Sequence, residues 1–160
     1  MDTNNENLTP FSELYLIMAN RAQHVTEVIE PTLKNQSILI CDRFHDATAA
    51  YQGFARGMAL DLIERLNQTV TKGLKPDLTI LLDCPVEVGL KRARGRMEAD
   101  DISWKEGRFE GERGDFHQRV RDAYLTIAKA EPHRIKVVDG SRDKHTVERK
   151  IRQLINPFLK

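Results

Sequence analysis

The sequence lacks the features that would place it in a membrane, in a secretory pathway or on nucleic acid. No apolar run approaches the ~20 residues that a membrane-spanning helix needs. Residues 1–7 are polar and acidic, so we expect no secretory signal and a cytoplasmic protein. A net charge of +1 gives no basic surface for bulk binding of nucleic acid. The only two cysteines, Cys41 and Cys84, each end an apolar run and are predicted to be buried, reduced thiols.

The helical pattern is clearest near the start of the chain. Apolar residues recur at intervals of three and four up to Ile29, which predicts a long amphipathic helix. Thr9 is a suitable N-cap for it, and Pro10 suits its first position. Similar patterns predict helices over 59–71 with Gly73 as a cap, over 85–93, over 116–130 and over 146–155.

Three short apolar runs, residues 37–41, 78–83 and 135–139, are typical of buried strands. Strands that are apolar on both faces and alternate with helices predict an α/β fold, with a parallel sheet flanked by helices in a single domain over 1–160. Each run ends in an aspartate: Asp42, Asp83 and Asp139. Because ligands of open α/β sheets bind beyond the carboxyl ends of the strands, we expect the site near these residues.

Arginines are frequent in or beside the loops and helix ends of the predicted ligand edge: Arg21, Arg43, Arg56, Arg92, Arg94, Arg96 and Arg108. Guanidinium groups bind phosphate in bidentate fashion, although a solvated surface position is the alternative for any one of them. The arginines after residue 91 lead into a stretch rich in Gly and charge without periodicity. This stretch predicts a mobile, arginine-bearing lid at about 94–114, as phosphoryl-transfer enzymes use.

A second group of polar residues follows Arg43. Thr48, Tyr51 and Gln52 have the spacing of one helical face. An amide can hydrogen-bond a pyrimidine edge in both directions at once. Since Gln and Thr are common in helices, this pattern alone is weak evidence for a base-binding site.

Several segments together resemble bacterial thymidylate kinases, which are P-loop nucleoside-monophosphate kinases. They occur in the order and spacing of that family over roughly residues 8–140: Asn20–His24, Ile40–Phe44, Ala50–Gly53, Gly73–Thr79, Pro85–Ala93, Arg108–Glu110 and Phe116–His117. The resemblance implies ATP-dependent phosphorylation of thymidine monophosphate (dTMP) to dTDP, with ATP and Mg²⁺ as cofactors.

The resemblance also implies roles for the acceptor side of the site. Arg43 is expected to bind the phosphate of dTMP. Arg21 and Gln52 are expected to address the thymine base, with Thr48 beside them. Tyr51 is expected to lie against the deoxyribose, where its bulk disfavours a 2′-hydroxyl.

On the donor side, the resemblance places Asp42 near the magnesium ion and the phosphates, and Arg92 against the adenine of ATP. The lid arginines, Arg96 with Arg94 or Arg108, are expected to reach the transferred phosphoryl group as the catalytic residues.

Two departures from the family pattern are visible. Ile17 stands where the family has a Phe that stacks on thymine, so we expect weaker or less selective dTMP binding. No Gly-x-x-x-x-Gly-Lys-Ser/Thr motif, which cradles the ATP phosphates, occurs in the 160 residues. By the resemblance, the first two strands of the family fold are absent, and Met1 corresponds to an internal position of a longer reading frame. Segments 37–41 and 77–83 would then lack a common neighbour.

Three functions remain open from the sequence. The first is a thymidylate kinase, with this chain alone weak or inactive. The second is a non-catalytic fragment of the same fold that binds dTMP or a partner. The third is a different nucleotide kinase, against which segments Tyr51–Gly53 and Gly73–Asp77 argue. The resemblance further suggests a homodimer.

Overall fold

The computed structural model describes residues 8–100 and 114–159, except for the side chains of Arg94 and of residues 96–100. The chain divides into two compact units, residues 7–75 and 76–160. Each unit is described by itself, and their union in a single domain stays a prediction. No helix in the described ranges is long and apolar enough to cross a membrane.

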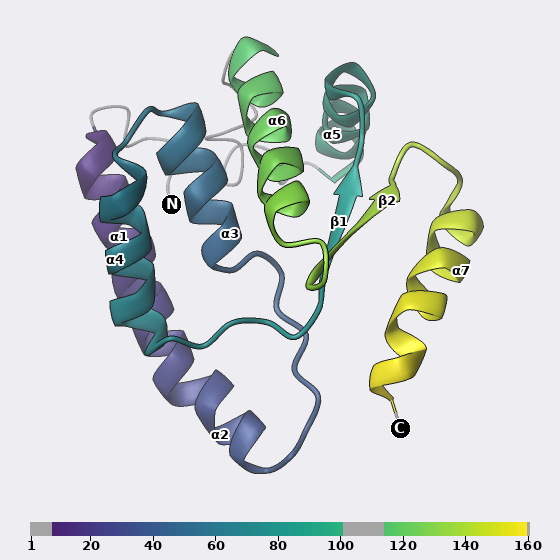
Figure 1. Ribbon diagram of the computed structural model, residues 1–160. Coiled ribbons are helices and arrows are strands. Elements are labelled where there is room, and N and C mark those ends of the chain that lie inside the picture. Colours follow the sequence, from purple (N-terminus) through teal and green to yellow (C-terminus); the bar gives the residue numbers. More distant parts are fainter. Residues whose placement is uncertain (1–7, 101–113, 160) are drawn as a thin grey trace. The chain divides into compact units, whose positions relative to one another are not determined.

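The unit of residues 7–75 is helical (Figure 1). The predicted first helix is confirmed as α1 (Pro10–His24), and it continues through a π-helical segment, η1 (Val25–Ile29), into α2 (Glu30–Lys34). Thr9 is its N-cap, because the threonine hydroxyl accepts a hydrogen bond from the backbone N–H of Ser12 at 3.2 Å.

Two further helical stretches complete this unit. A short helix, α3 (His45–Thr48), runs into a second π-helical segment, η2 (Ala49–Ala55). The predicted helix over 59–71 is confirmed as α4 (Leu60–Thr71). It ends at Lys72 and Gly73, both of which have the left-handed backbone that favours glycine.

The core of this unit lies between α1 and α4. Leu14 and Met18 of α1 pack with Ile63 of α4, and all three are buried. The η2 segment packs closely on the start of α4. A Cβ atom added to Gly53 would lie 2.6 Å from Cδ2 of Leu60. These contacts set η2 beside the helix pair and fix the position of the residues that it carries.

The prediction of a strand over residues 37–41 is wrong in this structure, where the segment has no regular secondary structure. A strand is stable only beside a neighbour that satisfies its backbone groups. The described residues hold one sheet, of two strands, and both belong to the other unit. Ile38 and Ile40 are accordingly 65% and 92% exposed. Asp42 therefore does not follow a sheet strand.

The unit of residues 76–160 contains the α/β part of the fold. Strands β1 (Thr79–Asp83) and β2 (Ile135–Asp139) are parallel, as predicted, and Thr79 pairs with Ile135 and Asp83 with Asp139. Helix α6 (Gly114–Ala130) packs on both strands, and α7 (Lys144–Ile155) packs on β2. A 3₁₀ turn, η3 (Asn156–Phe158), follows α7.

Helix α5 (Val86–Asp100) is longer than the predicted helix over 85–93. Residues 94–100 were expected to belong to a loop, but their backbone is helical. Met97, Glu98 and Ala99 are good helix formers, and the single Gly95 costs only about 1 kcal/mol relative to Ala. Residues 101–113 of the predicted lid lie outside the described residues.

Both cysteines are free thiols, as predicted, but they are half-buried rather than buried. Partial burial raises the pKa of the Cys41 thiol, since desolvation disfavours the thiolate, and the Arg21 guanidinium only partly offsets this effect.

Candidate functional site

One face of α1 carries three residues that matter for the site. Glu13, Ile17 and Arg21 are four residues apart, and a separation of four brings helical side chains onto the same face. Glu13 and Arg21 both bond to the segment formed by α3 and η2. Ile17 lies between them in sequence and is half-buried.

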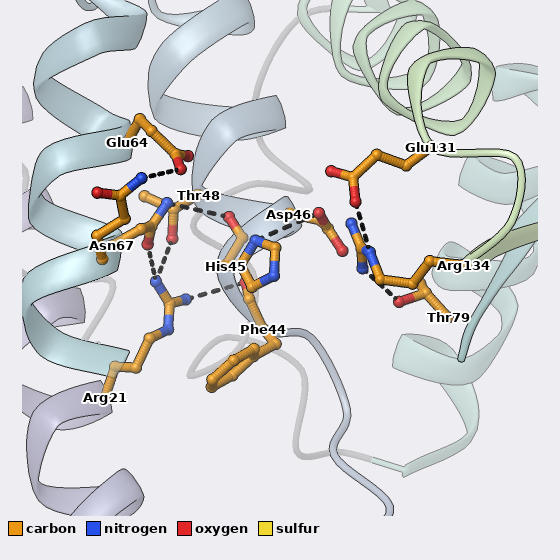
Figure 2. A network of polar contacts seen from close by, with 11 residues as sticks. Arg21, Phe44, His45, Asp46, Thr48, Glu64, Asn67, Thr79, Glu131 and Arg134 are labelled. Atoms are coloured by element: carbon orange, nitrogen blue, oxygen red, sulfur yellow. Dashed lines mark hydrogen bonds and ion pairs between the residues drawn. The ribbon is translucent and has the colours of Figure 1, made fainter. Parts of the chain in front are cut away.

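Arg21 is buried, with 9% of its surface exposed. Its Nη1 donates hydrogen bonds to Thr48 Oγ1 and Asn67 Oδ1, both at 2.8 Å, and its Nη2 donates to the carbonyl oxygen of Phe44 at 3.0 Å (Figure 2). The guanidinium carbon also lies 5.5 Å from the centre of the Phe44 ring. These contacts offset the cost of burying a cation and hold it in one orientation.

The network around Arg21 brings two of the predicted site residues together and adds a third residue. Arg21 and Thr48 were expected in one site and are directly bonded. Asn67 was not foreseen. It accepts from Arg21 and donates from Nδ2 to the carbonyl oxygen of His45 at 3.4 Å, so it links α4 to α3.

Glu13 has no exposed surface, although it carries a carboxylate. Its Oε1 accepts from Gln52 Nε2 at 2.8 Å and from Arg56 Nε at 3.1 Å, and its Oε2 accepts from Arg56 Nη2 at 3.3 Å. Gln52 is itself only 2% exposed. Arg56, which was predicted at the ligand edge, is therefore bound to Glu13. Glu13 was missed, although a charged residue on the apolar face of α1 is a signal in the sequence.

Arg43 and Tyr51 are brought together by the turn that precedes α3. The guanidinium carbon of Arg43 lies 4.3 Å from the centre of the Tyr51 ring, a cation–π distance. Arg43 is exposed and has a φ of 63°, which is unusual for a residue other than glycine and occurs often at functional sites. The neighbouring Asp42 is also exposed.

In the other unit, the carboxyl ends of β1 and β2 bring Asp83 and Asp139 side by side, as predicted. Arg121 of α6 donates to both carboxylate oxygens of Asp83, at 2.7 and 2.9 Å. This pair lowers the pKa of Asp83. The hydroxyl and backbone N–H of Ser141 likewise lower the pKa of Asp139 by donating hydrogen bonds to it.

Arg92 of α5 reaches the loop after β2. Its Nη1 and Nη2 donate to the carbonyl oxygens of Gly140 and Ser141. The side chains of Arg94 and Arg96 and all of Arg108 lie outside the described residues, so their predicted roles stay predictions.

The described residues contain no group of three or more His, Cys, Asp or Glu that could enclose a metal ion. An exposed Asp42 suits Mg²⁺ in a different way, since this ion binds to one or two carboxylates together with substrate phosphates.

Comparisons with known proteins agree on one family. A sequence profile of the thymidylate kinase family matches residues 1–151. The chain is 56% identical over 140 residues to a thymidylate kinase of Geotalea daltonii, covering 88% of this chain and 65% of the relative. It is 44% identical over 160 residues to one of Desulfovibrio desulfuricans, covering all of this chain and 74% of the relative.

A crystal structure of thymidylate kinase from Ehrlichia chaffeensis has a similar fold, with a TM-score of 0.71 at 31% identity, and the match covers 96% of this chain and 68% of that one. The chain spans less than two thirds of several relatives, for example 63% of the Geobacter sp. protein to which it is 54% identical.

Proposed function

The chain belongs to the thymidylate kinase family, and on that premise we propose that the protein phosphorylates dTMP to dTDP with ATP, for the synthesis of dTTP. Within it, residues 7–75 form the acceptor site for dTMP. The observation that carries this proposal is the buried Arg21 guanidinium, held by Thr48 and Asn67 on the helix face that also carries Glu13 and Ile17.

The acceptor site has a chemical role for each expected residue. The Arg21 donors suit a carbonyl oxygen of thymine, and Ile17 covers the base with an aliphatic side chain. Gln52 and Thr48 complete the edge that reads the base. The exposed Arg43 binds the phosphate, for which an arginine is well suited.

Tyr51, which contacts the Arg43 guanidinium, is expected to lie against the deoxyribose. Its ring would then leave little room for a 2′-hydroxyl, so that the site prefers a deoxyribonucleotide.

On the donor side, we propose that Arg92 lies against the adenine of ATP and that Asp42 serves Mg²⁺ indirectly. Bound Mg²⁺ would neutralise charge on the phosphates during transfer. The lid arginines Arg94, Arg96 and Arg108 would bring positive charge to the transferred phosphoryl group. We expect the protein in the cytoplasm and, from its family, as a homodimer.

A second candidate is a fragment that binds dTMP or a partner protein without catalysis. The observation that favours it is that the 160 residues contain no Gly-x-x-x-x-Gly-Lys-Ser/Thr motif. Phosphoryl transfer depends on positioning and charge stabilisation, and that motif supplies both for the ATP phosphates.

The two candidates are separated by measuring binding and turnover on the same protein. We expect the 160-residue chain to bind dTMP in calorimetry, with dGMP as a control that binds much more weakly. In a coupled assay with ATP and Mg²⁺, it should turn over far below the ~1–100 s⁻¹ usual for kinases. Absence of dTMP binding would refute the acceptor site. Turnover at kinase rates would refute the need for the missing motif.

A further inference from the structure

Glu13 is a buried carboxylate to which the proposed function gives no task. It has no exposed surface and is held by Gln52 and Arg56. A buried ion pair is often no more stabilising than an apolar replacement of the same volume, so stability alone is a weak reason for it. Its position next to Gln52, a proposed base-reading residue, suggests a role in recognition.

The chemistry of the two groups fixes the direction of the Gln52 amide. An ionised carboxylate only accepts hydrogen bonds, whereas an amide has one end that donates and one that accepts. Glu13 Oε1 therefore requires the NH₂ end of Gln52 to face it, and the two atoms lie 2.8 Å apart. Arg56 also bonds to both oxygens of Glu13. The carbonyl oxygen is the end of Gln52 that remains to be offered to a ligand.

This direction matters because pyrimidines differ in their edges. Thymine and uracil present an acceptor at O4 next to a donor at N3–H, whereas cytosine presents a donor at N4 next to an acceptor at N3. The Arg21 guanidinium only donates, and the Gln52 carbonyl only accepts. Arg21 lies eight positions after Glu13 on the helix, about 12 Å along its axis, with Ile17 midway between them.

We propose that Glu13 is a positioning residue that locks the Gln52 amide with its carbonyl toward the nucleotide, so that the site accepts thymine and uracil and rejects cytosine. This inference rests on the proposed function and adds to it the residue that sets the choice of base. From the sequence, the Gln52 amide was expected both to donate to the base and to accept from it. Under this inference it only accepts.

The test compares two variants that lose the same ion pair. Glu13→Gln removes both the charge and the acceptor-only character, so the Gln52 amide can turn either way. Arg56→Gln removes the charge pair but leaves the carboxylate opposite Gln52. Calorimetry on the 160-residue chain gives Kd for dTMP and dCMP. The ratio of Kd for dCMP to Kd for dTMP should fall about tenfold in Glu13→Gln, as the loss of one discriminating hydrogen bond implies. It should be unchanged in Arg56→Gln.

Each outcome decides between the explanations. A Glu13→Gln chain that binds both nucleotides more weakly at the wild-type ratio would show that Glu13 only supports the fold, and it would overturn the inference. An equal fall of the ratio in both variants would overturn it too, because the charge pair would then be the cause. If the wild-type chain binds no dTMP, the proposed function is refuted, and this inference is refuted with it.

A second measurement uses the wild-type chain and so does not depend on a variant that folds. In ¹⁵N-edited NMR spectra, the side-chain NH₂ of Gln52 should exchange slowly with water both before and after dTMP is added, because it stays bonded to Glu13. An NH₂ that exchanges fast in the free chain and becomes protected only on saturation with dTMP, as expected for an NH₂ that bonds the base directly, would overturn the inference.

Discussion

Replacement of Arg43 tests the proposed phosphate contact and the unusual backbone at once. Arg43→Ala removes the guanidinium but keeps a Cβ atom at a residue whose φ is 63°. A hydrogen bond to a charged group is worth about 1.5–3 kcal/mol, so Kd for dTMP should rise by about 10- to 150-fold. The contact with the Tyr51 ring, worth about 0.5–1 kcal/mol at an exposed site, is lost as well.

Arg43→Gly is the matched variant. It removes the same side chain, but glycine adopts a left-handed backbone without the cost of about 1–2 kcal/mol that other residues incur there. Both variants should lose dTMP affinity equally, while Arg43→Gly should melt about 2–8 °C above Arg43→Ala. Calorimetry and thermal melting measure the two effects separately. Unchanged dTMP affinity in Arg43→Ala would remove Arg43 from the site, and unequal affinities of the two variants would trace the effect to the backbone.

Three further predictions concern stability and the base. Arg121 lowers the folded-state pKa of Asp83, so the ion pair stabilises the fold above the unfolded-state pKa of about 3.9, and this stability is lost as the pH falls through the lower folded value. The melting temperature of Arg121→Met should therefore fall less between pH 5 and pH 2 than that of the wild-type chain. An equal fall in both proteins would contradict this expectation. Gly53→Ala should change the free energy of unfolding in urea by less than about 1 kcal/mol, because the added Cβ closely approaches only the end of the exposed Leu60 side chain, which can turn away, and because alanine favours a helix. A loss of more than about 2 kcal/mol would contradict this expectation. Ile17→Phe should tighten dTMP binding in calorimetry by about 2- to 10-fold through stacking, and an unchanged Kd would remove Ile17 from the base site.

Local signals in the sequence predicted the bounds of several elements. The Thr9 cap and the helical spacing after it placed the start of α1 correctly, and the apolar run 135–139 gave the bounds of β2. The run 37–41 has the same apolar character, but it lacks a paired neighbour and forms no strand. An apolar run forms a strand only where another strand lies beside it. The sequence of the run itself does not show whether such a neighbour is present.

The resemblance to the family placed Arg21 and Thr48 in one candidate site. Arg21 and Thr48 were expected together and are bonded. Glu13 and Asn67 were missed because they form hydrogen bonds with other side chains and have no expected contact with a ligand. The position of Glu13 on the apolar face of α1 was a signal in the sequence, but the partners of both residues become known only from contacts between segments far apart in sequence.

All residues of the proposed acceptor site belong to one unit, residues 7–75, and the contacts that orient them lie within it. The proposed recognition of the base therefore rests on the contacts among α1, α3, η2 and α4. Arg92 and the aspartates at the ends of β1 and β2 belong to the other unit. Since orientation of a binding group by its immediate neighbours decides its affinity, substitutions at Glu13 or Asn67 should alter dTMP binding without altering ATP binding. An effect of either substitution on ATP affinity as large as that on dTMP affinity would show that the two sites are coupled rather than separately organised.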